Sequence, residues 1–430
     1  MTYNEAIKYL EGSAVLGSKQ GLSAFKGLLS LMGSPEKRLK IIHVAGTNGK
    51  GSFCTYTESI LRAAGFTTGL FTSPHLIRYN ERIAFNGEPI SDEDFADEID
   101  FVKAKTKEFF GSSNQWFSFF EIITAACLSY FYKKSPGFVI LETGLGGRLD
   151  ATNAAESPLF TAITRIALDH TEFLGNTIEE IAAEKCGIIK ENRPCVSALQ
   201  CEEAEKVIRA YAAEKNAPLL YEPNPEIKII KNDLKGLTMD IKTHYYSYKG
   251  LVSGMGGSYQ PQNIAAVLLG IEALRKQGYA IPDKAVYEGI KTAKIKGRTD
   301  IISKSPLIIA DGAHNLNAAE EFDKTTAEVK AQGKKITLLT GVLADKNPEK
   351  LIKALSKNAD RVILTVPPSK RAFNPEGLTL EGKDVYFEPD PEKACKLLKG
   401  FDDSVIFITG SLYLTGKIYA LLKENESLFS

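Results

Sequence analysis

Short, continuously apolar runs alternate with longer stretches of helical periodicity along most of the chain. Strands are predicted at 39–45, 67–71, 138–141 and 159–166, and helices at 50–64, 91–109 and 121–132. Strands that are apolar throughout and separated by helices are typical of a mostly parallel sheet that is covered on both faces. We therefore expect an α/β fold with a P-loop-type N-terminal domain.

The stretch 225–250 has a different pattern. Its apolar run 227–230 and the alternating run 239–242 lie between turn residues. Alternation of this kind predicts a small antiparallel β region, which we expect to be appended to the first domain. The segment 259–263 then opens a helix, because Pro261 suits a first helical turn.

A second alternating series begins near residue 297. Its predicted strands are 307–310, 336–341, 361–366, 385–387 and 405–409, with helices at 317–330 and 348–357. This pattern indicates a smaller, doubly wound, Rossmann-like unit. A chain of 430 residues also exceeds what one hydrophobic core usually supports. We predict two domains, 1–296 and 297–430.

The charge balance argues against a nucleic acid or an anionic membrane as the main partner. Lys plus Arg and Asp plus Glu both total 53, so the formal net charge is zero. Six cysteines without a C-x-x-C pair favour reduced thiols. The N-terminus lacks a basic region followed by an apolar run, and no apolar run approaches the roughly 18 residues of a membrane span. We expect a cytoplasmic protein.

The most informative local motif is a glycine-rich turn between the strand 39–45 and the helix 50–64. It reads Gly46, Thr47, Asn48, Gly49, Lys50, Gly51 and Ser52. A helix N-terminus preceded by glycines binds phosphate through converging N–H groups, with Lys50 toward the β- and γ-phosphates and the Ser52 hydroxyl toward Mg²⁺. The common phosphate-loop pattern is not met, because Val44 replaces its first glycine and Gly51 follows the lysine directly. The alternative is a plain glycine-rich turn.

The heptad G-T-N-G-K-G-S resembles the nucleotide loop of the bacterial folylpolyglutamate synthase/dihydrofolate synthase family, part of the Mur ligase superfamily. The resemblance covers nearly the whole chain in the family's order. It continues through T-S-P-H-L (72–76), N-E-R-I (80–83), F-F-E (119–121), E-T-G-L-G-G-R-L-D-A-T-N (142–153), L-D-H (168–170), E-K-C-G-I-I-K (184–190), D-G-A-H-N (311–315) and T-G-S-L-Y-L (409–414).

The resemblance implies an ATP-dependent ligase that joins L-glutamate to the carboxylate of a folate or pteroate through an acyl phosphate. Its implied small-molecule ligands are ATP held between the domains, L-glutamate, dihydropteroate or a reduced folate, two Mg²⁺ ions and a monovalent cation. The protein is expected to be a monomer. Both synthase activities are expected. The alternatives are a synthase that only extends the glutamate tail and a Mur-type peptidoglycan ligase.

Site residues follow from the same resemblance. Catalytic roles fall to Lys50, His170, Lys185 and Arg298; ATP contacts, besides the loop 46–52, to Asn263, Arg298, Asp311 and His314; Mg²⁺ contacts to Ser73, Glu142 and His170; and pterin or folate contacts to Arg82, Ser118, Phe119, Phe120, Glu121, Leu149, Asp150 and Ala151. Lys185 matches a lysine that carries a carbamate. The family's usual glutamate is Asp300 here, which puts only that residue's role in doubt.

Several of these residues also have plain structural interpretations. Glu142 ends an apolar strand, where ligands of open α/β sheets gather, but it also suits an edge salt bridge. His170 suits a helix cap or a place in the core, Lys185 suits a solvated helix face, and one of Phe119 and Phe120 suits the core. A carbamate at Lys185 requires an amine whose pKa is lowered by burial.

Two rival classes have sequence signatures that this chain lacks. A muramyl ligase needs a UDP-binding N-terminal domain of about 100 residues, whereas the phosphate loop arrives by residue 46. A GTPase needs an N-K-x-D-like segment, and the run 345–347 does not supply one.

Overall fold

The computed structural model describes residues 1–16, 21–113, 115–233 and 236–424. Its contacts divide the chain into two compact units. The first comprises 1–226, 241–248 and 262–293, and the second comprises 227–240, 249–261 and 294–430. The sequence-based boundary at 296/297 stays a prediction, but the contacts place 227–240 and 249–261 with the second unit.

A mostly parallel sheet forms the centre of the first unit, with strand order β4-β3-β2-β5-β1-β6-β7-β8. Its strands are β1 (Ile41–Ala45), β2 (Thr68–Phe71), β3 (Ile83–Phe85), β4 (Glu88–Pro89), β5 (Phe138–Glu142), β6 (Phe160–Ile163), β7 (Cys195–Ser197) and β8 (Leu219–Tyr221). The strands β2, β5, β1, β6, β7 and β8 pair in parallel, and β3 and β4 are added antiparallel at one edge. The carboxyl ends of these six parallel strands therefore all lie at the same end of the sheet.

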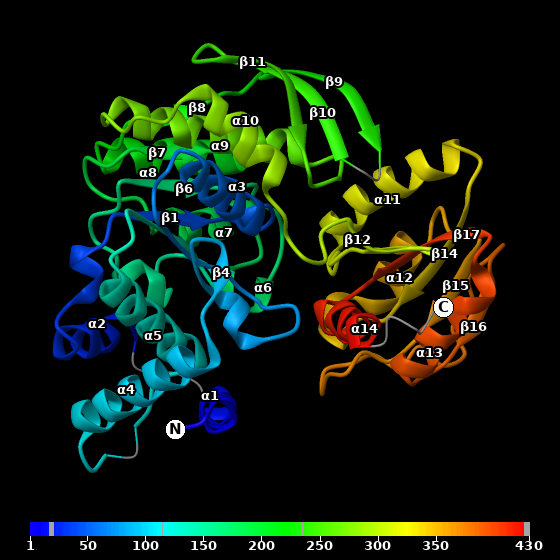
Figure 1. Cartoon of the computed structure of the whole chain (residues 1–430), viewed down its shortest axis with the longest axis horizontal. Coiled ribbons are helices and arrows are strands. Elements are labelled where there is room, and N and C mark those ends of the chain that lie inside the picture. The colour runs from blue at the N-terminus through cyan, green and yellow to red at the C-terminus, as the bar shows by residue number, and fades with distance from the viewer. Residues whose placement is uncertain (17–20, 114, 234–235, 425–430) are drawn as a thin grey trace. The chain divides into compact units, whose positions relative to one another are not determined.

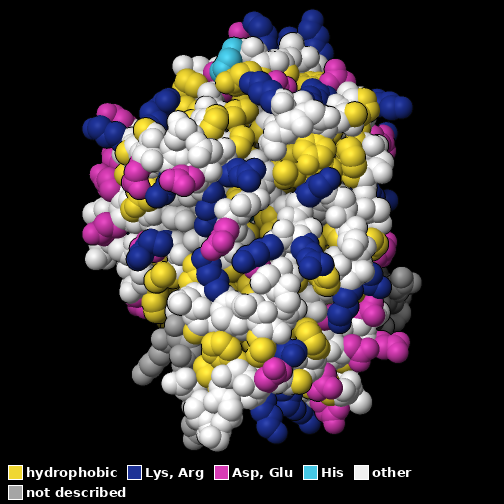
Figure 2. Space-filling view, turned by 90° about the vertical axis from the view of Figure 1, so that its left-hand side faces the viewer, with side chains coloured by type: hydrophobic (Ala, Val, Ile, Leu, Met, Phe, Trp, Pro, Cys, Tyr) yellow, Lys and Arg dark blue, Asp and Glu magenta, His cyan; other side chains and the backbone are white. Residues whose placement is uncertain are grey.

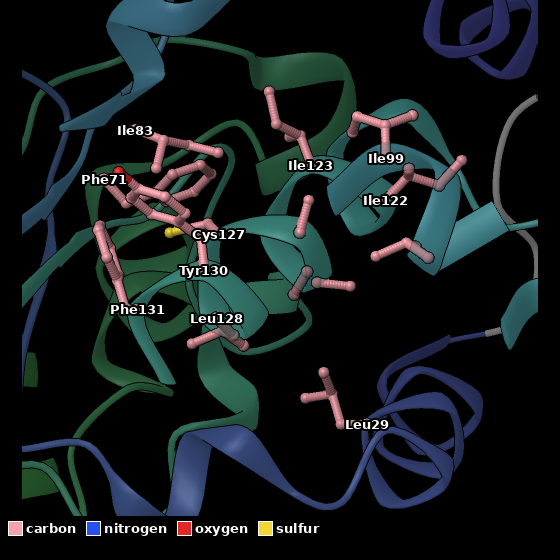
Figure 3. Close-up of a cluster of buried hydrophobic side chains, with 14 of the residues drawn as sticks. Leu29, Phe71, Ile83, Ile99, Ile122, Ile123, Cys127, Leu128, Tyr130 and Phe131 are labelled. Atoms are coloured by element: carbon pink, nitrogen blue, oxygen red, sulfur yellow. The ribbon is translucent and has the colours of Figure 1, made fainter. Parts of the chain in front are cut away.

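Helices cover both faces of this sheet (Figure 1). The helices of this unit are α1 (Tyr3–Leu16), α2 (Gly21–Leu31), α3 (Lys50–Ala63), α4 (Asp92–Phe110), α5 (Phe119–Lys134), α6 (Thr171–Leu174), α7 (Ile178–Cys186), α8 (Glu202–Glu214), α9 (Gln260–Lys276) and α10 (Asp283–Thr292), with 3-10 turns η1 (Pro35–Arg38), η2 (Tyr79–Arg82) and η3 (Ala151–Ala154). On one face, α5 is buried almost all round. Its side chains pack with Leu29, Phe71, Ile83 and Ile99 (Figure 3).

The strand β1 shows how the layers meet. Its successive residues face opposite sides of the sheet, so Ile41 and Ala45 lie on the same face. Ile41 belongs to the cluster around α5, and Ala45 to a cluster with α7 and α8. On the opposite side, α3 packs closely on α10, because a Cβ at Gly289 would lie 2.4 Å from the Ile60 Cα. The whole strand is buried, as its apolar pattern predicts.

The stretch predicted to be antiparallel forms the sheet β11-β10-β9, with β9 (Glu226–Asp233), β10 (Gly236–Lys242) and β11 (Ser247–Ser253). The rest of the second unit is built on the sheet β12-β13-β17-β14-β15-β16. Its elements are β12 (Asp300–Lys304), β13 (Leu307–Ala310), α11 (Leu316–Ala331), β14 (Lys335–Thr340), η4 (Ala344–Lys346), α12 (Pro348–Leu355), β15 (Arg361–Leu364), β16 (Asp384–Phe387), α13 (Pro391–Leu397), η5 (Leu398–Phe401), β17 (Ser404–Thr409) and α14 (Leu412–Glu424).

Separate hydrophobic clusters cover the two faces of this second large sheet. One contains Phe322 of α11 and Leu351 of α12, and the other contains Ala394 of α13 and Leu414 of α14. The sheet is parallel apart from β12, which pairs antiparallel with β13. The expected fold class, a mostly parallel sheet with a small β region and a smaller doubly wound unit, is confirmed.

The predicted strands and helices are found within a few residues of their expected ends. The sequence pattern does not predict β3, β4, β7, β8 and β12, which are short or only half-buried and lack a long apolar run. On the face drawn in Figure 2, basic and acidic side chains are interspersed with hydrophobic ones, in keeping with the equal charge totals. No helix in the described part of the chain combines the length and apolar character that crossing a membrane requires.

Candidate active site

The predicted phosphate loop connects β1 to α3, and two glycines give it its shape. Gly46 has φ 153° and Gly49 has φ 87°, and left-handed values such as the second favour glycine. A Cβ at position 46 would lie 1.9 Å from the Thr164 Oγ1, and one at position 49 would lie 2.5 Å from the Asn263 Oδ1. Both positions therefore exclude a side chain. The second contact also places Asn263, a predicted ATP residue, against the loop.

Hydrogen bonds fasten this loop to the segment after β6. The N–H groups of Thr47 and Asn48 both donate to the Arg165 carbonyl, at 3.0 and 3.1 Å. The Thr47 Oγ1 donates to the Ala167 carbonyl at 3.0 Å and accepts from the Ala167 N–H at 3.1 Å. The sequence does not reveal this partner segment, because a strand-to-helix motif carries no information about a loop more than a hundred residues away.

The first turn of α3 is suited to an anion. The Phe53 N–H donates to the Gly49 carbonyl, and this is where the helical ladder begins. The amides of Lys50, Gly51 and Ser52 precede the ladder, and Gly49 supplies no side-chain cap. Such amides, together with the helix dipole, form an anion site.

Lys50 lies over its own loop. Its Nζ donates to the Gly46 carbonyl at 3.2 Å and to the Thr47 carbonyl at 3.3 Å. The side chain is half-buried. Its ammonium group is thus held beside the helix N-terminus, where phosphate charge would lie.

A second lysine reaches the same carbonyl. Lys185, near the end of α7, is 4% exposed and donates from its Nζ to the Gly46 carbonyl at 2.9 Å. Burial, and then the positive charge of Lys50, lower the pKa of Lys185 to about 7. The solvated-lysine interpretation is therefore wrong for the described structure, and the lowered pKa that a carbamate requires is present.

The carboxyl ends of β5 and β2 bring two predicted Mg²⁺ contacts together. Glu142 is 4% exposed, and its Oε2 accepts from the Ser73 N–H at 3.1 Å. Val44, just before the phosphate loop, pairs in register with Glu142. Carboxylate and hydroxyl oxygens are the hard donors that Mg²⁺ prefers. Within the described residues, no three His, Cys, Asp or Glu side chains gather as a metal cage. These oxygen donors fit an Mg²⁺ ion that also binds phosphate.

The third predicted metal contact, His170, lies at the start of α6. It has φ 50°, and its backbone N–H donates to the Asp169 Oδ1 at 2.9 Å. The side chain is 45% exposed. His170 caps the helix through its backbone without a side-chain cap bond, and its role as a ligand stays a prediction.

The segment 142–153 folds into a loop in which the Asp150 carboxylate accepts hydrogen bonds from residues of the loop itself. The Asp150 Oδ2 accepts from the N–H groups of Gly144 and Leu145, both at 2.9 Å. Its Oδ1 accepts from the Thr152 N–H at 3.0 Å and the Thr152 hydroxyl at 2.5 Å. Burial raises the pKa of Asp150 against these bonds. Leu149, in contrast, is 62% exposed.

This Asp150 loop, 144–153, packs on the end of α7. A Cβ at Gly147 would lie 2.8 Å from the carbonyl oxygens of both Glu184 and Lys185. The Arg148 Nη2 also pairs with the Glu184 Oε1 at 2.7 Å. The loop therefore supports the helix that carries Lys185.

The predicted pterin residues on α5 include a helix cap. Glu121 and Ser118 form a capping box, in which the Ser118 N–H donates to the Glu121 Oε2 at 2.8 Å. Phe119 and Phe120 are both half-buried against the core, and the Phe120 ring lies 5.8 Å from that of Phe71. We expected one of the two rings to be in the core, but both pack against it and neither is fully buried.

Arg82 is buried beside these aromatic rings. Its guanidinium lies 5.0 Å from the centroid of Phe119, and its Nε donates to the His75 Nδ1 at 2.9 Å. Burial, and then the charge of Arg82, lower the pKa of His75 to about 4. His75 is thus a neutral acceptor that orients the arginine.

In the second unit, Arg298 and Asp311 lie close together. The Asp311 Oδ2 accepts from the Thr299 N–H at 2.9 Å and from its hydroxyl at 3.0 Å. Burial raises the pKa of Asp311, and the neighbouring Arg298 opposes the rise. His314 contacts the Gly312 carbonyl through its Nδ1 at 2.7 Å. Thr299, which the sequence does not single out, follows Arg298 directly and bonds to Asp311.

Comparison with known proteins identifies this arrangement. Residues 44–270 match the model of the Mur ligase middle domain, and residues 297–412 match that of the Mur ligase, glutamate ligase domain. The chain belongs to the Mur ligase family, a class of ATP-dependent, amide-forming ligases.

Individual relatives narrow the family. The chain is 37% identical over 430 residues to the dihydrofolate synthase/folylpolyglutamate synthase of Bacillus subtilis (strain 168), covering 98% of this chain and 99% of that protein. A folylpolyglutamate synthase (FPGS) structure from Thermotoga maritima is similar with a TM-score of 0.85 and 33% identity, covering 98% of this chain and 96% of that one. An FPGS–AMPPCP–folate complex is similar with a TM-score of 0.86 and 28% identity, and the match covers 98% of this chain and 100% of that one. Within the Mur ligases, the chain belongs to the dihydrofolate synthase/folylpolyglutamate synthase family, as the sequence predicts.

Proposed function

We propose that this chain joins L-glutamate to the carboxylate of a folate or pteroate at the expense of ATP, through an acyl phosphate. The observation that carries the proposal is at the carboxyl edge of the first sheet. There the Nζ atoms of Lys50 and Lys185 meet on the Gly46 carbonyl at a helix N-terminus, and Glu142 is the register neighbour of Val44. Positive charge and an acidic metal donor beside an anion site suit phosphoryl transfer.

In the proposed reaction, the ATP phosphates bind the first-turn amides of α3, and Lys50 leaves its loop carbonyls to contact them. The substrate carboxylate attacks the γ-phosphorus and ADP departs. The amine of glutamate then attacks the acyl carbon, and phosphate leaves with one carboxylate oxygen. We assign charge neutralisation to Lys50 and Arg298, and further ATP contacts to Asn263, Asp311 and His314.

We propose that Ser73, Glu142 and His170 hold Mg²⁺, with two ions and a monovalent cation expected by resemblance. The hard oxygen donors of Ser73 and Glu142 support this assignment. When bound, the ion supplies positive charge to the phosphate oxygens. The geometry described above assigns no other step to it.

The pterin or folate is proposed to contact Arg82, the segment 118–121 and the segment 149–151. Half-buried aromatic rings at 119 and 120 can stack on a flat heterocycle, and exposed Leu149 can cover it. Both oxygens of Asp150 already accept bonds within the loop, so Asp150 contacts the substrate only by exchanging them, whereas the bonds of Glu121 to Ser118 occupy its Oε2 alone. We further propose a cytoplasmic monomer.

Both synthase activities are proposed for this chain, because the B. subtilis relative carries both in its name. Purified protein would be mixed with ATP, Mg²⁺ and glutamate, and with either dihydropteroate or tetrahydrofolate. Phosphate release that requires glutamate is expected with each. Release with tetrahydrofolate alone would leave only tail extension, and release with neither would refute the assignment.

Lys185 is proposed to carry a carbamate formed from CO₂. Its burial and lowered pKa favour the neutral amine that reacts. A carbamate nitrogen keeps one N–H, so the bond to the Gly46 carbonyl can persist. ¹³C-bicarbonate should give a carbamate NMR signal that Lys185→Ala abolishes together with activity. Unchanged activity in Lys185→Ala would disprove the role.

A further inference from the structure

A buried polar chain runs from the centre of the first sheet to the turn that follows Glu142. His43, on β1, is fully buried, and its Nε2 lies 2.8 Å from the Thr152 hydroxyl. That hydroxyl is 2.5 Å from the Asp150 Oδ1. The other carboxylate oxygen accepts from the amides of Gly144 and Leu145. Nothing in the reaction outlined above uses His43.

The hydrogen bonds that connect His43, Thr152 and Asp150 allow one consistent arrangement of hydrogens. An ionised Asp150 only accepts, so the single Thr152 hydroxyl hydrogen points to it. Toward His43 the hydroxyl oxygen is then an acceptor, and the histidine must carry its hydrogen on Nε2. The Nδ1 is buried and has no hydrogen-bond partner among the described residues. Burial lowers the pKa of His43 to about 3, so the ring is neutral and its tautomer is fixed.

An unpartnered buried nitrogen on a central strand costs stability that an apolar residue would not. The neighbouring strand residues in register with His43 are Leu141 on β5 and Thr161 on β6, at the heart of the sheet. What the histidine supplies, and an apolar residue would not, is the Nε2–H donor to Thr152 in the Asp150 loop.

We propose that His43 is a positioning residue for the ligase reaction. Through Thr152 it holds the carboxylate of Asp150 in place, and this carboxylate in turn holds the Gly144–Leu145 turn beside Glu142. The inference rests on the proposed function. It assigns to β1 a second role besides leading into the phosphate loop. Because the Asp150 loop also packs on the Lys185 carbonyl, the same hydrogen bonds support the segment that carries Lys185.

The test compares variants that keep or remove the donor. His43→Gln places an amide N–H near the Nε2 position, whereas His43→Leu offers none. We expect kcat/KM for the folate substrate to fall about 10-fold or more in His43→Leu and in Thr152→Val, as for lost supporting bonds at a site. His43→Gln and Thr152→Ser should recover most of the loss.

The double variant His43→Leu/Thr152→Val distinguishes a shared path from two separate ones. If His43 acts through Thr152, the double variant loses about as much as the worse single variant, rather than the product of the two losses. Any rise in KM for ATP should be smaller than the fall in kcat/KM for the folate substrate, since the hydrogen-bonded network ends at the Asp150 loop and meets the phosphate loop only through Lys185. Multiplicative losses, or an equal rise in KM for ATP, would overturn the inference.

Thr161→Val is the matched control. Thr161 is fully buried on the adjacent strand, opposite His43 in register, and belongs to no bond of the chain described here. Its loss should leave kcat/KM unchanged. A fall equal to that in Thr152→Val, or no recovery in His43→Gln, would show a general packing effect and contradict a positioning role.

Nitrogen NMR of ¹⁵N-histidine protein gives a readout independent of turnover. We expect the His43 ring to be the neutral Nε2–H form from pH 8 down to about 5, well above its own pKa. A Nδ1–H tautomer would overturn the proposal. A wild-type protein that releases no phosphate refutes the proposed function, whereas an active wild type with a fully active His43→Leu refutes only this inference.

Discussion

The phosphate loop and the Asp150 loop follow neighbouring strands of the same sheet, yet they use their polar groups in opposite ways. In the phosphate loop, the first-turn amides of α3 precede the helical ladder, and two lysines converge on one carbonyl. In the Asp150 loop, the one buried carboxylate accepts bonds from its own backbone and from Thr152. The first is built to bind a ligand, and the second to hold its shape.

This contrast separates two kinds of residue that a motif search treats alike. Both loops are rich in glycine, and both belong to the segments that carry the family resemblance. Geometry shows which polar atoms are already satisfied. A residue such as Asp150 should therefore affect stability as much as activity, whereas Lys50 should affect activity almost alone.

The largest expected effect is that of Lys50→Met. Removing a cation that contacts the transferring phosphoryl group should lower kcat by about 10³-fold, with little loss of stability. Turnover and urea denaturation of the same preparations check both parts. Lys350→Met, at an exposed position of α12, is the control and should behave as wild type. A Lys50→Met enzyme within 10-fold of wild type would contradict the ligand-binding side of the contrast.

Asp150→Asn should show the reverse pattern. An amide has one acceptor oxygen, so it cannot receive the bonds of Gly144, Leu145 and Thr152 together. We expect a loss of about 1–3 kcal/mol in the free energy of unfolding. Asp97→Asn, on the exposed face of α4, should change it by less than about 0.5 kcal/mol. Equal stability of the two variants in urea titrations would remove the structural role.

Lys185 should leave a signature in the pH dependence of stability. Its folded-state pKa of about 7 lies below the ordinary 10.5, so between these values the unfolded chain binds more protons than the folded one. Stability of the wild type relative to Lys185→Met should therefore rise with pH in this window, by at most about 1.4 kcal/mol per pH unit. Urea titrations from pH 7 to 9 in CO₂-free buffer measure it. A flat or falling difference would mean that the folded-state pKa is not lowered.

Leu149→Ala should have the smallest effect on the fold. Its side chain is 62% exposed, so the free energy of unfolding should stay within about 0.5 kcal/mol. A few-fold rise in KM for the pterin substrate, with KM for ATP unchanged, is the expected result of steady-state assays. No change in either KM would remove Leu149 from the substrate site.

Much of this arrangement could be predicted from the chain alone, and the remainder had a physical reason to be hidden. Strands such as 138–142 are visible because both faces are buried and the residues 138–141 are all apolar. The phosphate loop is visible because its chemistry belongs to consecutive backbone groups. Neither periodicity nor spacing, however, indicates that Lys185 reaches Gly46 or that Asn263 contacts Gly49, because these pairs meet only after the sheet has formed.

The internal use of polar side chains was also hidden. The sequence assigned Glu121 and Asp150 to the substrate, and the structure adds a capping box for the first and a web of loop bonds for the second. The sequence does not distinguish His43, since one histidine in an apolar strand resembles an ordinary core residue. Its significance depends on Thr152, which lies 109 residues away.

The most direct test of the account follows oxygen atoms. Tetrahydrofolate or dihydropteroate labelled with ¹⁸O in the reacting carboxylate is turned over with ATP and glutamate, and the phosphate is analysed by mass spectrometry. An acyl phosphate intermediate predicts one ¹⁸O in each phosphate released and one retained in the new amide. Phosphate free of ¹⁸O, with glutamate still joined to the substrate, would contradict it.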